Sequence, residues 1–337
     1  MNKPDKILLA HGSGGSYYQQ LVEEVFVPAF SNPVLSQLAD AAVVAGGTEQ
    51  LAMTTDSFVV RPRFFAGGDI GRLAVCGTVN DLAMSGATPR WLSCGMVLEA
   101  GLPIAELQRI CASMAAAAAE AGVAIICGDT KVVEAGAADG IYINTAGIGT
   151  FPAGRKPLPC RLTPDSLIIA SGTLGDHGLA VLAARENLNF SPPLASDAAP
   201  LNGLIADLLE AAPDTEWLRD PTRGGLAGVL CEWAEKSGYD VEVAEEAIPV
   251  APAVRAACEL LGISPLHAAC EGRLIAAVPP HQAEAALAAL RAHPYGRDAA
   301  IIGRVLEKEQ GRALLRTPYG SLRRLEPLDG EQLPRIC

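Results

Sequence analysis

The sequence predicts an α+β protein of two domains followed by a short tail. Three observations support this. Helix-like and strand-like apolar patterns alternate along all 337 residues. Residues 151–159 hold three prolines and a glycine, which neither a helix nor a strand tolerates. Apolar periodicity fades from about Glu326. We therefore expect domains at residues 1–152 and 160–325, and a flexible tail at residues 326–337.

Each expected element follows from its apolar spacing. Ile104, Leu107 and Cys111 recur at helical intervals, for example, and so predict one amphipathic helix. The helices predicted in this way cover residues 103–122, 204–209, 225–238 and 283–293. Short runs rich in β-branched and apolar residues predict strands. These runs cover residues 51–55, 91–98, 123–127, 141–149, 167–170, 274–278 and 300–305.

Composition narrows the class of protein. Half of the residues are apolar, so a large core can form, and the net charge of −12 argues against a nucleic-acid partner. No apolar run is long enough to cross a membrane or to form the core of a signal peptide. The nine cysteines contain no C-x-x-C pair, which argues against a disulfide framework or a structural zinc site. We expect a reducing, cytoplasmic protein.

Several aspartates stand in turn-like, glycine-flanked segments. Asp40, Asp56, Asp81 and Asp129 could present hard oxygen ligands to Mg²⁺ from the ends of strands. Lys131, two residues after Asp129, suits a phosphate. The alternative for each aspartate is an ordinary helix or turn cap. A cap is harder to argue for Asp81, because it lies inside an apolar helical run where a carboxylate needs a partner.

Three further segments could carry chemistry. The glycine-rich residues 12–15 precede an expected helix and could bind phosphate or form a flexible turn. Residues 220–226 open another helix with two glycines, and Asp220 there either caps the helix or lines an anion site. Glu271 stands among small apolar residues, where a raised pKa would suit a general base. The alternative for Glu271 is a solvated turn carboxylate.

The last residue of the sequence is Cys337. Chain ends are usually mobile, and the last twelve residues could span roughly 40 Å when extended. Cys337 is therefore either an incidental surface cysteine or a carrier that takes a group at one site and brings it to another.

Taken together, these segments resemble the PurM-like ATP-dependent superfamily and, within it, the HypE hydrogenase maturation factors. The motifs that carry the resemblance are HGSGG at 11–15, TTDSFVV at 54–60, GTVNDLAMSGATP at 77–89, GDTKVV at 128–133, SGTLGDHG at 171–178, RDPTRGGL at 219–226 and PRIC at 334–337. One segment departs from the family pattern. The family usually has Asn-Glu-Gly-Lys where this chain has Cys270-Glu271-Gly272-Arg273, which leaves the glutamate in place.

The resemblance implies a PurM-like fold in which the N-terminal sheets of two chains pair in a homodimer and create a nucleotide cleft. It also implies a reaction. The carbamoyltransferase HypF loads Cys337 with a carbamoyl group, and ATP-dependent dehydration converts this S-carboxamide to a thiocyanate. The cyano group then passes to iron on the HypC–HypD scaffold, for the centre of NiFe hydrogenase.

The resemblance assigns roles to residues as well. It implies ATP and Mg²⁺ as cofactors. It implies catalytic roles for Cys337, Glu271 and Lys131, metal ligation by Asp40, Asp56 and Asp81, and nucleotide binding by these aspartates together with Asp129, Asp220 and Lys131.

Two other classes of function stay open on the residues alone. A small-molecule ATP-dependent synthetase or kinase on the same fold would not use Cys337. A non-catalytic partner protein would use the tail as a docking peptide, with the aspartates capping turns.

Overall fold

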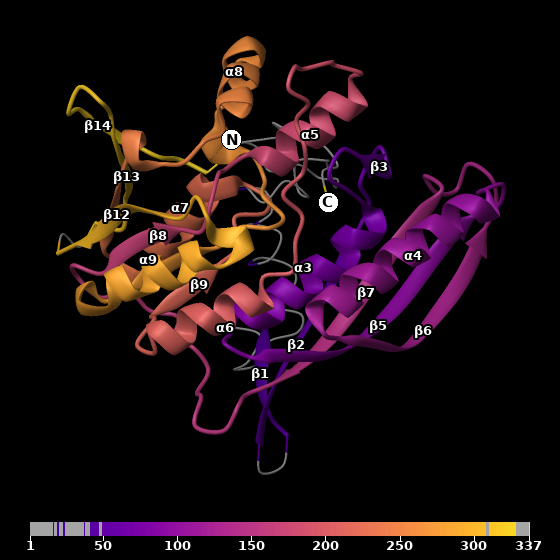
Figure 1. Cartoon of the computed structure of the whole chain (residues 1–337), viewed down its shortest axis with the longest axis horizontal. Coiled ribbons are helices and arrows are strands. Elements are labelled where there is room, and N and C mark those ends of the chain that lie inside the picture. The colour runs from indigo at the N-terminus through magenta and orange to yellow at the C-terminus, as the bar shows by residue number, and fades with distance from the viewer. Residues whose placement is uncertain are drawn as a thin grey trace.

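The computed structural model describes residues 16, 19, 23, 37, 41–46, 49–307, 310–327 and 337. Asp40 and the glycine-rich segment at 11–15 lie outside these residues. The described chain forms two halves, each built on its own sheet, and they lie side by side in Figure 1.

The N-terminal half contains a five-stranded sheet in the order β1-β2-β7-β5-β6. Its strands are β1 (Ala42–Gly46), β2 (Glu49–Phe58), β5 (Thr88–Glu99), β6 (Ala124–Val133) and β7 (Ile141–Thr150), and its helices are α3 (Ile70–Met84) and α4 (Ile104–Ala121). A small hairpin of β3 (Phe64–Phe65) and β4 (Gly68–Asp69) precedes α3. Neighbouring strands are antiparallel except for the parallel pair β5 and β6.

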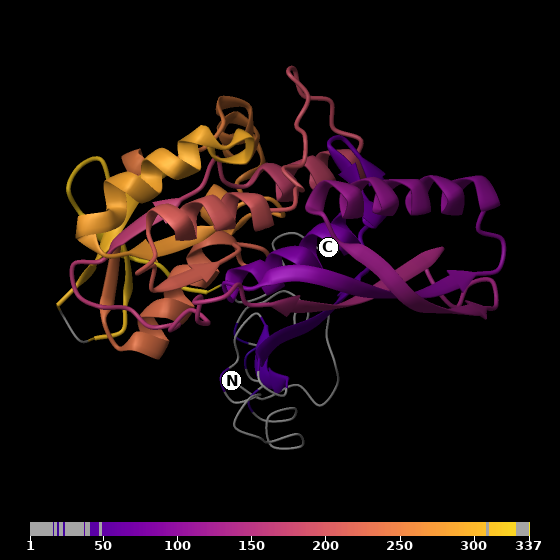
Figure 2. The same cartoon turned by 60° about the horizontal axis from the view of Figure 1, so that its bottom comes forward.

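Helices α3 and α4 lie against one face of this sheet, as Figure 2 shows. Helix α3 is apolar or small on nearly every side, and it is buried almost throughout because α4 and the second half cover what the sheet leaves open. Its first turn is capped by Asp69, whose carboxylate accepts the N–H groups of Gly71 and Arg72. Helix α3 therefore lies at the centre of the molecule, between the two sheets.

The C-terminal half contains a seven-stranded sheet in the order β14-β13-β10-β12-β8-β11-β9. Its strands are β8 (Leu167–Ala170), β9 (Trp217–Arg219), β10 (Asp240–Ala244), β11 (Ile275–Val278), β12 (Ala300–Leu306), β13 (Ala313–Arg316) and β14 (Leu322–Arg324). Its helices are α5 (Asp176–Arg185), α6 (Asn202–Ala211), α7 (Gly225–Ser237), α8 (Pro252–Leu261) and α9 (Ala283–Ala292), with single 3₁₀ turns at Glu245–Ala247, Pro265–His267, Pro280–Gln282 and Pro294–Gly296. One core packs around α7, and a second packs α6 and α9 against the sheet.

Polar contacts join the two halves. Arg72 of α3 donates from Nε to the carbonyl of Ala198 at 2.7 Å, and it also pairs with Glu120 of α4 at 2.8 Å. The hydroxyl of Tyr295 donates to the same Glu120 carboxylate. Asn202 donates to the carbonyl of Ala121 at 2.8 Å. These bonds fix the C-terminal half against α3 and α4.

The four helices and seven strands expected from periodicity are all present, with ends shifted by a few residues. Two positional expectations are wrong. Asp129 and Lys131 do not follow a buried strand, because β6 continues to Val133 and is exposed at the edge of the sheet. Asp56 does not end its strand, because β2 continues to Phe58. Among the described residues, no helix is long and apolar enough to span a bilayer.

Candidate active site

Two of the predicted aspartates come together between β2 and α3. Thr54 and Asp56 point from the same face of β2 toward α3, since side chains alternate along a strand. Thr54 Oγ1 donates to Asp81 Oδ2 at 2.9 Å. Asp56 Oδ2 lies 3.8 Å from where a Cβ on Gly77 would stand, one helical turn before Asp81. The carboxylate of Asp56, from β2, therefore packs against the turn of α3 that precedes Asp81.

This pair fits a hard cation. Burial raises the pKa of the Asp56 carboxyl, against the lowering effects of Arg223 and of the Ser57 N–H. A bound cation would stabilise the charged form that burial disfavours. Among the described residues, no group of three or more His, Cys, Asp or Glu could hold a metal ion by itself. Mg²⁺ does not need such a cage, because it commonly takes one or two carboxylates together with phosphate oxygens and water.

A second part of the site comes from two loops of the C-terminal half. At the first residue of α7, Gly225 has φ +59°, and a Cβ there would lie 2.7 Å from the carbonyl of Leu266. Cys270 N donates to the carbonyl of Pro221 at 2.9 Å. This close packing brings the loop that carries Asp220 and Arg223 against the segment that carries Glu271.

Glu271 is 3% exposed, so it is not the solvated turn carboxylate that the sequence also allowed. Burial raises its pKa well above the ordinary value, and the carboxylates of Asp220 and Asp56 add to that rise, while Arg223 opposes it. Within the described part of the chain, Glu271 Oε1 has no hydrogen-bond partner. A buried carboxyl oxygen without a partner can exchange a proton with a bound substrate group.

Cys337 lies at the same place. It is half-buried against the apolar core of the N-terminal half, and Figure 1 shows this end of the chain near α3 and β3. Burial raises the pKa of its thiol, and the Glu271 carboxylate is the next largest cause; Arg223 lowers it. The thiol of Cys337 is therefore within electrostatic reach of Glu271, Asp56 and Asp220.

The structure does not bring Asp129 and Lys131 to this site within one chain. They pair with each other at 2.6 Å on β6, and each side chain is about 70% exposed. Across the sheet, Asp129 is in register with Gly95, Asn144 and Ser57. Ser57 follows Asp56 on β2 and therefore points away from α3, and Asp129 points to the same side. Three strand spacings of about 4.8 Å separate β6 from β2, which is about 14 Å.

Both halves match known families. The family described as AIR synthase related protein, N-terminal domain, matches residues 38–151, and the corresponding C-terminal domain matches residues 163–316. Carbamoyl dehydratase HypE of Azotobacter vinelandii is 50% identical over 329 residues, which is 98% of this chain and 96% of that protein. The chain belongs to the HypE family. Its fold is accordingly PurM-like, with one AIR synthase related domain in each half.

Two solved structures of HypE proteins align along most of the chain. A HypE–HypF complex gives a TM-score of 0.87 at 47% identity, covering 91% of this chain and 99% of the HypE chain. A HypE in complex with ATP gives a TM-score of 0.82 at 48% identity, covering 98% of this chain and all of that one. The first relative binds HypF and the second binds ATP.

The sequence analysis missed one residue of the site in this HypE-family chain. Arg223 acts electrostatically on Asp56, Glu271 and Cys337, which come from three distant parts of the chain. A signal was present, because Arg223 is the arginine next to the two glycines of the RDPTRGGL motif at 219–226.

Proposed function

We propose that this chain is an ATP-dependent carbamoyl dehydratase that acts on a carbamoyl group carried by its own Cys337. One observation carries the proposal: Cys337 packs on the core of the N-terminal half within electrostatic reach of the buried carboxyl of Glu271 and of Asp56, which lies close to Asp81. A carrier cysteine, a candidate base and a candidate cation site thus meet in one place.

The chemistry requires this combination. Dehydrating an amide expels an oxygen that would otherwise leave as hydroxide. Transfer of the γ-phosphoryl group of ATP to the carboxamide oxygen lets that oxygen leave as phosphate, and the two N–H protons are removed as the nitrile forms. The products are ADP, phosphate and the S-cyano group on Cys337. Glu271 is our candidate to take a proton, and Arg223 is placed to stabilise negative charge on the oxygen that leaves.

For the cation, Asp56 and Asp81 are the described residues that would hold Mg²⁺, with Asp40 from outside the described part. Bound there, Mg²⁺ would neutralise charge on the transferred phosphoryl group. Asp220 is 8% exposed and lies within electrostatic reach of Glu271, so we assign it to the nucleotide side of the site.

We expect Asp81→Asn to reduce ATP turnover by at least about a hundredfold, because the neutral amide cannot replace a carboxylate ligand. The fold should persist, since the amide oxygen can still accept from Thr54. The measurement is phosphate release at saturating ATP and Mg²⁺. Asp214→Asn is the control: its exposed carboxylate on the C-terminal half accepts a hydrogen bond from Gln282. Turnover in Asp81→Asn equal to that of the control would remove Asp81 from the site.

We also propose that the N-terminal sheets pair in a homodimer. The sheet face opposite α3 exposes large apolar side chains, with Met53 at 51% and Trp91 at 44%. Both stand in register with Ile148 of β7, so the three form one row across the sheet. An apolar sheet face of this kind favours association. Asp129 and Lys131 point from the same face, so in such a dimer they would meet the neighbouring chain, and we propose that they act on its nucleotide.

We expect Trp91→Glu to convert the dimer to a monomer, because two charges would be buried at the pairing face. Light scattering coupled to size-exclusion chromatography measures the mass. Tyr319→Glu is the control, since this side chain is 95% exposed on the C-terminal half, and it should leave the dimer intact. A wild-type protein that is already monomeric, or a dimer that survives Trp91→Glu, would contradict the proposed interface.

The partners follow from the family. We propose that HypF loads Cys337 and that a HypC–HypD complex accepts the cyano group for the iron of NiFe hydrogenase. We also keep the domain limits at residues 1–152 and 160–325, with the tail at 326–337. In this arrangement, the tail carries one group between three proteins while the two domains hold the nucleotide site.

Mass spectrometry of the C-terminal peptide tests the function. The chain is incubated with HypF and carbamoyl phosphate, and then with ATP and Mg²⁺. We expect first the mass increment of one carbamoyl group on Cys337, and then the loss of one water. ATP consumption with an unchanged mass of this peptide would favour a small-molecule kinase or synthetase instead.

A further inference from the structure

The main chain of Glu271 is held from both halves of the protein. Its N–H donates to Asp197 Oδ1 at 3.1 Å. Its carbonyl accepts from Asn80 Nδ2 and from the N–H of Ala199, each at 3.4 Å. Asn80 belongs to α3 of the N-terminal half, whereas Asp197 lies in the C-terminal half, on the segment between α5 and α6. The N–H of Glu271 is thus bonded by the C-terminal half, and its carbonyl by both halves.

Asp197 is buried at this contact, and among the described residues its Oδ2 has no hydrogen-bond partner. Its side chain is 1% exposed, and Oδ2 lies 3.8 Å from Nε of Arg273. The N–H of Gly272 also bonds to its carboxylate. A buried carboxylate is costly unless it is paired and hydrogen-bonded, so its partners here stabilise one position of the turn at residues 271–273.

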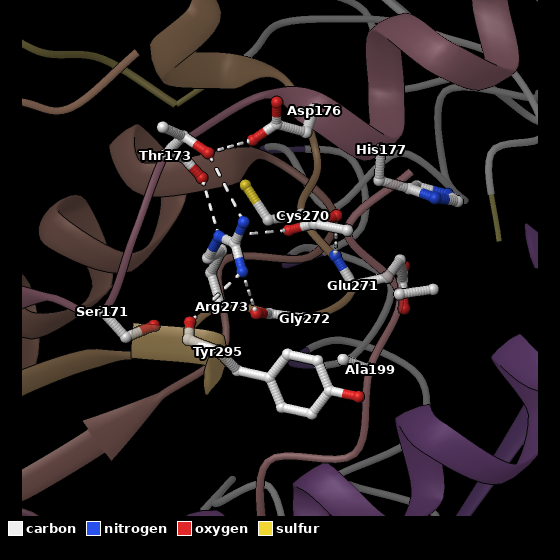
Figure 3. Close-up of polar contacts among 12 residues, drawn as sticks. Ser171, Thr173, Asp176, His177, Ala199, Cys270, Glu271, Gly272, Arg273 and Tyr295 are labelled. Atoms are coloured by element: carbon white, nitrogen blue, oxygen red, sulfur yellow. Dashed lines mark hydrogen bonds and ion pairs between the residues drawn. The ribbon is translucent and has the colours of Figure 1, made fainter. Parts of the chain in front are cut away.

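Arg273 extends the same support. Its guanidinium donates to the carbonyls of Thr173 and Gly272, both at 3.0 Å, and more weakly to that of Tyr295 at 3.5 Å, as Figure 3 shows. A planar guanidinium can serve several fixed acceptors at once, which a lysine ammonium does with less geometric definition. Arg273 therefore ties the turn that carries Glu271 to the rest of the C-terminal half.

Asn80 holds the main chain of Glu271 from the N-terminal half. It is 1% exposed, and its amide is used fully: Nδ2 donates to the carbonyl of Ala199 at 3.1 Å, and Oδ1 accepts from the N–H of Leu201 at 2.7 Å. It also precedes Asp81 on α3. One helix therefore positions a candidate Mg²⁺ ligand and, through Asn80, the main chain of the candidate base.

The turn has no spare room. A Cβ on Gly272 would lie 1.8 Å from the carbonyl oxygen of Asp197 and 3.0 Å from the nitrogen of Ala199. The turn at 271–273 and the segment at 197–199 are therefore in direct backbone contact. A shift of either would move the Glu271 carboxyl relative to Cys337.

We propose that Asp197 and Asn80 form an interdomain clamp that positions the carboxyl of Glu271 toward Cys337. Both are positioning residues, since they act through the main chain of Glu271. The proposal rests on the proposed function, in which Glu271 takes a proton from the carboxamide on Cys337. It adds that the base is aligned by the contact between the two halves, and not by its own loop.

The test follows a single turnover on the full-length chain after loading by HypF, with loss of water from the C-terminal peptide measured against ATP concentration. We expect Asp197→Asn and Asn80→Ser each to lower the rate at saturating ATP by tenfold to a hundredfold, which is about the cost of misplacing a reacting group by 1 Å. The ATP concentration for half-maximal rate should not change. The double variant should be little slower than the slower single variant, because both side chains hold the same residue.

Asp240→Asn is the matched control. Asp240 is also fully buried and paired with an arginine, Arg312 at 2.6 Å, but it lies on β10 of the C-terminal sheet. It should keep the wild-type rate even if its stability falls. Should Asp197→Asn fail to fold, the test rests on Asn80→Ser. This variant must then show a lower rate at saturating ATP with an unchanged ATP concentration for half-maximal rate.

Three results would overturn the clamp. Both single variants could keep the wild-type rate at saturating ATP, or they could differ from the wild type only in needing more ATP for the half-maximal rate. The third is a double variant whose loss of rate equals the two single losses combined. Failure of the proposed function looks different. In that case, the carbamoyl group on Cys337 of the wild-type chain loses no water after ATP is added, or Glu271→Gln dehydrates it at the normal rate.

Discussion

We expect Cys337→Ala to bind ATP as the wild type does and to accept no carbamoyl group. The substitution removes the thiol but none of the groups at the candidate cation site, Asp56 and Asp81, so the nucleotide contacts should stay in place. After incubation with HypF and carbamoyl phosphate, the intact mass should be unchanged, whereas the wild type gains one carbamoyl group. Calorimetry with Mg·ATP checks that binding persists.

Cys111→Ala is the control for this experiment. Cys111 is an exposed cysteine on α4 and lies outside the proposed site. Its removal should leave loading at the wild-type level. A carbamoyl increment on Cys337→Ala would show that another residue is the acceptor, and the proposed function would then be wrong.

We expect Glu271→Gln to accept the carbamoyl group on Cys337 normally but not to dehydrate it. The glutamine amide cannot take a proton, and loss of a general base typically reduces the rate by about 10² to 10⁴. The carbamoyl increment on Cys337 should therefore persist after ATP is added. The infrared nitrile band of the thiocyanate should be absent on a timescale that converts the wild type completely.

The raised pKa of Glu271 gives this prediction its physical basis. Burial and the nearby carboxylates of Asp220 and Asp56 favour the protonated form, so once it loses that proton Glu271 is a stronger base than an exposed glutamate. Glu216→Gln is the control: Glu216 is also buried, accepts hydrogen bonds from Thr163, and precedes β9 at the end away from Asp220. A nitrile band of normal intensity in Glu271→Gln would assign the proton transfer to another group.

Local sequence patterns were sufficient for much of the fold. Helix α4 was predicted because its apolar residues recur at helical spacing between a proline and a glycine, and both residues do flank the helix in the structure. The short apolar run at residues 274–278 predicts a strand, and β11 is present there and buried on both faces. These features depend on neighbours within one element, which a sequence displays directly.

Exposure of β6 could not be predicted in the same way. Its apolar start, residues 124–126, reads as a buried strand, yet Ile126 is 63% exposed. A run of apolar residues has the same pattern whether its own chain or a second chain covers it. For this reason Asp129 and Lys131 were expected beside Asp56, whereas within one chain they lie on the opposite face of the sheet.

The sequence by itself determined the residue types on which the proposed roles depend: Cys337 as a carrier, Glu271 as a base, and the aspartates of β2 and α3 as ligands. Only the tertiary structure decided which of them meet. Asp56, the loop with Asp220 and Arg223, Glu271 and Cys337 come from four separate places along the chain, and Asn80 and Asp197 act through backbone groups of other residues. Such contacts arise from the packing of α3 between two sheets, and they leave no periodicity or spacing in the sequence.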